Sequence, residues 1–188
     1  VGYGDFTVNY AYRKGSWDVT NTYTNGATTN ETQDQKEQEI TLRWLVRPLS
    51  MKYLTPYVLA GYSQIDFDDT ETLPSTWFWT YNGRQVKKYT TQYKSPLLGI
   101  GAIIPLNSTV GFRVDGRALY SHAEYKLDNG YTVSGSGVGF AGTATMYVNV
   151  YEGLNLQFGG KYQWLNGGDA GSRGIGGVFA MLGYSYKF

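Results

Sequence analysis

Hydrophobic residues alternate with polar residues along nearly the whole chain of 188 residues. In the clearest run, Val110, Phe112 and Val114 occupy one face, while Arg113 and Asp115 occupy the other. Successive side chains of a β-strand point to opposite faces of the sheet, so a period of two predicts strands with one apolar and one polar face. Almost no segment has a helical period. The alternation therefore predicts an all-β protein.

Eight segments with this period are present, and they cover residues 5–13, 39–46, 54–67, 88–104, 110–121, 138–150, 154–164 and 178–188. The phase of the third is ambiguous, because Tyr57 and Leu59 compete with Val58 and Ala60 for the apolar face. Connections after the second, fourth and sixth segments are short. Longer loops are expected at residues 15–35, 68–87, 127–134 and 166–174. The pattern predicts one domain, residues 1–188, folded as an antiparallel up-and-down sheet of eight strands.

Composition excludes several classes of protein. The chain contains no cysteine, which rules out disulfide scaffolds, thiolate zinc sites, iron–sulfur clusters and cysteine nucleophiles. The net charge is +1, so there is no basic excess that would favour a nucleic-acid partner. Charged residues make up only 16% of the chain, whereas 18 tyrosines and 25 glycines are present. We expect no cofactor and no metal.

The low charge and the aromatic residues favour a membrane barrel over a soluble one. The longest apolar run, Leu97–Leu106, is too short for a membrane helix, which needs about 20 residues. A membrane strand needs only about 9–11 residues, and only alternate ones must be apolar. Tyr10, Tyr120 and Trp164 fall near strand ends, where aromatic girdles meet the lipid headgroups. Because every backbone group in lipid must be paired, such a sheet is expected to close into a barrel.

The C-terminal alternation of Leu182, Tyr184, Tyr186 and Phe188 resembles the insertion signature of bacterial outer-membrane barrels. The whole chain resembles the small eight-stranded members, such as the OmpA transmembrane domain, OmpX and OmpW. This resemblance implies a bacterial outer-membrane location, with short periplasmic turns and longer extracellular loops. It also implies the barrel-insertion machinery, outer-membrane lipids and lipopolysaccharide as partners. The role it implies is structural or surface interaction.

Ionisable residues on the polar faces are expected to point into the lumen of the barrel. The predicted lumen network comprises Asp5, Glu39, Arg43, Arg113, Asp115, Arg117 and Lys161. Buried charges must be paired, and an eight-stranded interior is narrow enough for side chains to fill. We therefore expect ion pairs that plug the lumen, with Asp115 bridging Arg113 and Arg117. The alternative is a narrow channel or transporter for small or hydrophobic solutes.

His122 is the only histidine and raises the question of an enzyme. Ser121 and His122 are adjacent on a strand, so their side chains point to opposite faces and cannot form a dyad. Glu124 shares the face of His122, and a nucleophile would have to come from another strand. The order of these residues differs from the His-x-Ser pattern of the lipid A deacylases. We expect no enzymatic activity, with lipid modification at His122 as the least favoured alternative.

The connection between the third and fourth segments is rich in acidic and aromatic residues. The acidic residues 66, 68, 69 and 71 lack a fixed ligand spacing, so solvated charge is favoured over a Ca²⁺ site. Trp77, Phe78 and Trp79 form a candidate surface for a ligand or adhesion partner. A competing interpretation is a soluble lipocalin, because residues 15–17 match the G-x-W motif of that family. In lipocalins, however, this motif opens the first strand, whereas here it follows it.

Overall fold

The computed structural model describes residues 6–22, 28–46, 49–72, 86–151 and 154–184. Its eight strands are β1 (Phe6–Thr22), β2 (Thr28–Leu45), β3 (Thr55–Thr72), β4 (Val86–Pro105), β5 (Val110–Leu127), β6 (Thr132–Tyr151), β7 (Leu154–Asn166) and β8 (Ser172–Tyr184). They pair antiparallel in chain order, from β1 to β8, in one sheet. The prediction of an all-β, up-and-down, eight-stranded fold is therefore confirmed. No helix in these ranges is long and apolar enough to cross a bilayer.

Several strands are longer than the hydrophobic pattern predicts. β1 and β2 stay in register from Phe6 opposite Trp44 to Thr22 opposite Thr28. The prediction of a loop over residues 15–35 was therefore wrong for most of that range. The backbone ladder continues because its hydrogen bonds need no apolar face, whereas the sequence pattern detects a strand only where one face is apolar.

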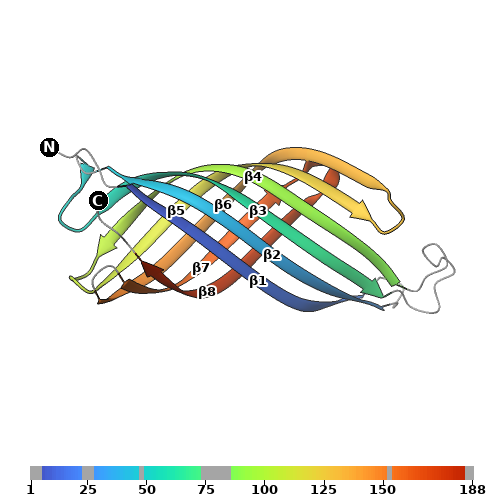
Figure 1. Ribbon diagram of the computed structural model, residues 1–188, viewed down its shortest axis with the longest axis horizontal. Coiled ribbons are helices and arrows are strands. Elements are labelled where there is room, and N and C mark those ends of the chain that lie inside the picture. Colours follow the sequence, from blue (N-terminus) through green and yellow to red (C-terminus); the bar gives the residue numbers. More distant parts are fainter. Residues whose placement is uncertain (1–5, 23–27, 47–48, 73–85, 152–153, 185–188) are drawn as a thin grey trace.

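The sheet curls, so that strands far apart in the pairing order face one another. β2 and β7 are five strands apart, which would separate them by about 24 Å in a flat sheet. Instead, Lys161 Nζ on β7 lies 2.7 Å from Glu39 Oε2 on β2. Figure 1 shows the strands inclined to the long axis of the molecule. The curling creates a concave face, which carries Glu39 and Lys161, and a convex face that points outward.

The two edge strands approach each other through side chains. In the described ranges, no ladder of backbone hydrogen bonds joins β1 to β8. The Arg13 guanidinium on β1 lies over the Phe179 ring on β8, with 5.6 Å between the guanidinium carbon and the ring centroid. The contact places the inward side chains of these two strands within reach of each other.

Large apolar side chains are exposed on the convex face of every strand. The phase of β3 is now decided, because Tyr57 and Leu59 are buried on the concave face and Val58 is exposed on the convex one. The exposed set that we call the convex apolar band includes Val8, Tyr10, Ile40, Leu42, Val58, Tyr62, Leu98, Ile100, Phe112, Val114, Tyr120, Val138, Phe140, Phe158, Tyr162, Val178 and Leu182. A soluble barrel would bury such residues, so this arrangement is opposite to that of a lipocalin.

The convex apolar band ends at a row of polar residues that neighbouring strands place side by side. Gln38 lies opposite Gln64, Gln64 opposite Lys94, Lys94 opposite His122, and His122 opposite Ser136. Beyond this row, toward the connections of β1 with β2 and of β3 with β4, the convex face is polar. The strands therefore have an apolar half near the chain termini and a polar half away from them.

Candidate functional site: the charged interior

The centre of the concave face is a chain of buried ion pairs. Glu39 accepts hydrogen bonds from Arg117 Nη1 and Lys161 Nζ, both at 2.7 Å. Lys161 also lies 2.5 Å from Glu37, which pairs with Arg13 at 3.0 Å. The side chains of Glu37, Glu39 and Arg117 are at most 5% exposed. The chain of pairs joins side chains of four strands, β1, β2, β5 and β7, and so it spans the interior.

Asp115 connects this chain to the next layer of the interior. One of its oxygens accepts from Arg117 Nε at 2.5 Å, and the other accepts from the Tyr57 hydroxyl at 2.9 Å. A Cβ at Gly101 would collide with the Tyr57 ring, so glycine there gives the ring its place over β4. Small residues on the concave face thus make room for the large polar ones.

The predicted bridge from Asp115 to both arginines does not form. Asp115 holds Arg117, but Arg113 donates instead to Gln157 Oε1 at 2.7 Å, and Gln157 donates to Asn155 at 2.5 Å. Residues two apart on a strand share a face, but the direction of each long side chain depends on the strands opposite. For Arg113 the partner comes from β7.

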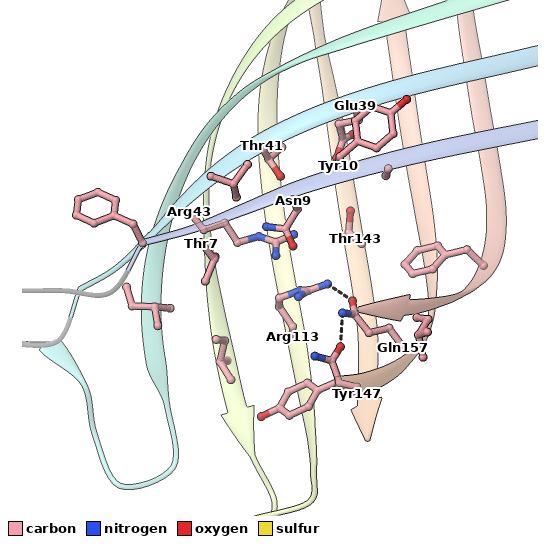
Figure 2. A pocket seen from close by; sticks show the side chains of 18 of the residues that line it. Thr7, Asn9, Tyr10, Glu39, Thr41, Arg43, Arg113, Thr143, Tyr147 and Gln157 are labelled. Carbon is pink, nitrogen blue, oxygen red and sulfur yellow. Dashed lines mark hydrogen bonds between the residues drawn. The ribbon is translucent and has the colours of Figure 1, made fainter. Parts of the chain in front are cut away.

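Arg43 and Arg113 remain without a carboxylate partner in the described part of the chain. Arg43 is 8% exposed, and its guanidinium lies 5.8 Å from the centroid of the Tyr57 ring. The Nε atoms of both arginines are buried and make no hydrogen bond. In Figure 2 both side chains reach into a cavity of about 620 Å³. The cavity also contacts Asn9, Thr143 and Gln157.

An apolar layer lies farther along the strands, beyond the ion pairs and away from the chain termini. Ile65, Phe67, Tyr93 and Leu165 are at most 2% exposed. The rings of Phe67 and Tyr93 meet edge to face, with centroids 6.0 Å apart. These tightly packed side chains exclude water from this part of the interior.

A further ion pair covers the apolar layer. Arg173 Nη2 lies 2.8 Å from Asp69, and the guanidinium carbon of Arg173 is 4.2 Å from the centroid of the Phe67 ring. Burial raises the pKa of the Asp69 carboxyl, and the hydrogen bond from Arg173 opposes that rise. The interior therefore alternates between charged and apolar layers.

His122 lies outside this interior, on the exposed convex face. Its Nδ1 is 2.9 Å from Ser136 Oγ on β6, whereas the adjacent Ser121 is buried on the concave face and contacts Ser95. Glu124 pairs with Lys126 at 2.8 Å rather than with the His122 ring. A histidine and a serine are thus together, but the carboxylate that would orient the ring is engaged elsewhere.

The acidic run of β3 is divided between the two faces. Asp66 accepts from Gln92 at 2.6 Å on the convex face, and Asp68 pairs there with Lys36 at 3.5 Å. Asp69 points to the concave face and Arg173. In the described ranges, no group of three or more histidine or carboxylate side chains converges as a metal site would require.

Some predicted residues lie outside the described ranges, namely Asp5, Trp77, Phe78, Trp79, Tyr186 and Phe188. Leu182 is 65% exposed on the convex face, and the backbone of Tyr184 pairs with Leu154. Sequence analysis missed Glu37 in the predicted lumen network, although its alternation with Glu39 could have indicated it. The Asp69–Arg173 pair carries no such local signal, because the two residues are 104 positions apart.

No protein-family model matches this chain, and no curated protein matches it.

Proposed function

We propose that this protein is a closed β-barrel of a Gram-negative outer membrane, with a structural or surface-interaction role and an interior plugged by ion pairs. The observation that carries the proposal is the inversion of polarity. Large apolar side chains are exposed on the convex face of all eight strands, while charged side chains are buried in pairs on the concave face. Lipid is the solvent in which such an outer surface is stable.

The dimensions of the convex apolar band suit a bilayer. On β5 the band extends from Phe112 to Tyr120, which is about 27 Å along the strand at ~3.4 Å per residue. A strand tilt of roughly 35–45° reduces this to about 20 Å along the membrane normal, close to the ~25 Å apolar band of outer-membrane barrels. Tyr10, Tyr62 and Tyr120 border the polar row, where their hydroxyls would reach the headgroups.

A plugged interior is supported by two successive obstructions. The first is the chain of pairs among Glu37, Glu39, Arg117 and Lys161, and the second is the buried layer around Phe67. An ion crossing the barrel would have to break the first and displace the second. The alternative of a narrow channel or transporter requires both to rearrange.

We propose no catalytic role for His122, because Glu124 is paired with Lys126. Lipopolysaccharide and outer-membrane lipids are proposed as partners of the convex face, where the exposed Lys94 follows the apolar band. The barrel-insertion machinery is proposed as a partner during assembly. A surface ligand is proposed for the connection between β3 and β4.

Single-channel conductance in a planar bilayer tests the proposal. The refolded protein is first shown to be folded by its heat-dependent mobility in SDS gels. We expect no steady conductance from folded wild-type protein. A steady conductance that changes in the Arg113→Gln or Arg117→Gln variant would contradict the plugged interior and would indicate a water-filled path. Failure to partition into liposomes would contradict the membrane location itself.

A further inference from the structure

Among the described residues, the interior near the chain termini carries more positive than negative charge. Five cations occupy the middle and terminal part of the concave face, namely Arg13, Arg43, Arg113, Arg117 and Lys161, and they face three carboxylates, Glu37, Glu39 and Asp115. The three carboxylates are taken by Arg13, Arg117 and Lys161. The excess therefore resides on Arg43 and Arg113.

These two arginines are held close to each other without internal compensation. Arg43 is more than nine-tenths buried and makes no hydrogen bond or ion pair with the described chain. Asp115 attracts it, but both oxygens of that carboxylate already accept from Arg117 and Tyr57. Arg113 repels Arg43, and its hydrogen-bond partner in the described ranges is the neutral Gln157. A buried guanidinium is stable only when an anion or other acceptors satisfy it.

We propose that Arg43 and Arg113 form a binding site for an oxyanion, such as a phosphate or carboxylate group. The site lies on the concave face, at the end of the sheet near the chain termini. Both guanidinium groups present planar donor pairs, which match the oxygens of such a group. The buried Asn9 Nδ2 and the Thr143 hydroxyl also line the cavity and are without hydrogen-bond partners in the described chain. Figure 2 shows Asn9, Arg43 and Arg113 around the same space.

The cavity suggests what the rest of the ligand is like. Its volume of about 620 Å³ exceeds that of a bare phosphate, since one water occupies about 30 Å³ in the liquid. Apolar side chains form another part of the wall, among them Leu45, Ile103 and Phe179. The site can therefore take an inorganic anion or the head of an anionic lipid whose chain lies along this wall. Both sources share the same oxyanion chemistry.

Calorimetric titration of the refolded protein in dodecyl maltoside, a detergent without charge or phosphorus, tests the site. One arm uses inorganic phosphate and the other dihexanoyl phosphatidic acid, both at constant ionic strength. We expect saturable binding of at least one probe, weakened tenfold or more in the Arg43→Gln/Arg113→Gln double variant. Phosphate binding at least as tightly as the lipid indicates a free anion, and tenfold tighter lipid binding indicates a headgroup. Absence of binding in both arms would overturn the proposal.

The matched control is Lys88→Gln, which removes one positive charge from the exposed convex face, beyond the row of polar residues that ends the convex apolar band. It should leave the Kd of either probe unchanged, and a loss as large as that of the double variant would show diffuse attraction rather than a site. The stability of the double variant provides an independent test. Without phosphate, the double variant should be at least as stable as wild type, because it removes uncompensated charge.

A measurement on the wild-type chain avoids any dependence on folding of the variant. Resonances of the arginine Nε–H groups are followed in ¹⁵N-labelled protein during addition of the probe that binds. Arg43 and Arg113 should shift together and saturate, while Arg173, which is paired with Asp69, should not move. Shifts confined to other arginines would overturn the assignment.

Discussion

Neutralising Glu39 should weaken the fold more than neutralising any exposed carboxylate. Glu39 forms ion pairs with Arg117 and Lys161, whose side chains are only 2% and 8% exposed. Removing one partner of a buried pair costs about 3–5 kcal/mol, because a charge is left uncompensated. In Glu39→Gln, Arg117 keeps Asp115 and Lys161 keeps Glu37. We therefore expect the lower value, a loss of about 3 kcal/mol of unfolding free energy, or roughly 150-fold in the equilibrium constant.

The assay is urea-dependent unfolding in detergent micelles, followed by tryptophan fluorescence and by the heat-dependent gel shift. The control is Asp68→Asn, which removes a carboxylate from an exposed pair. Lys36 and Asp68 are 3.5 Å apart and about half exposed, so this change should cost less than ~1 kcal/mol. Equal losses in the two variants would refute the importance of the buried pairs.

A double-mutant cycle between Glu39→Gln and Lys161→Met then measures their coupling. Because the two side chains are in contact at 2.7 Å, the combined loss should be smaller than the sum of the single losses by about 1 kcal/mol or more. Strict additivity would indicate that the contact contributes nothing to stability.

Two further substitutions test the packing of the interior and the lipid-facing surface. Gly101→Ala should lower the unfolding free energy by about 1–3 kcal/mol, because the new Cβ would displace the Tyr57 ring. In Gly116→Ala the new Cβ meets nothing within 4 Å, so this control should be nearly neutral. Urea unfolding of both variants measures the difference, and equal stability of the two would contradict the prediction. Ile100→Arg should cost about 2–4 kcal/mol in lipid vesicles, whereas Thr90→Arg, beyond the convex apolar band, should cost at most about 1 kcal/mol. If Ile100→Arg folds into vesicles as readily as wild type, this face does not contact lipid.

Much of the fold follows from the alternation of residue types. The run from Val110 to Asp115 already separates the two faces of β5, and the structure keeps that separation. The predictions were less accurate where the alternation is weak. Beyond Arg13, β1 has few apolar residues and the facing part of β2 has polar residues on both faces, so the pattern indicated a loop although the ladder continues to Thr22. Backbone pairing leaves no mark on side-chain polarity there.

The pairing of charges could be predicted only in part. Glu39 and Arg117 were expected on the concave face because each occupies a polar position of an alternating strand. Their contact was not predictable in detail, since they are 78 residues apart. For Arg113, spacing along β5 suggested Asp115, but a residue on β7 is the actual partner. Short-range spacing places a side chain on a face and does not choose its partner across the interior.

By itself, the sequence determined the all-β class, the number of strands and which side chains share a face of a strand, because a strand places alternate residues on opposite sides whatever its neighbours are. Tertiary structure decided the rest. The curl and stagger of the sheet set which strands meet across the interior, and so brought Lys161 to Glu39 from 122 residues away. The same geometry left Arg43 and Arg113 facing a cavity rather than a carboxylate. Side-chain contacts across the interior depend on the tilt and stagger of all eight strands together, which no local segment of the sequence encodes.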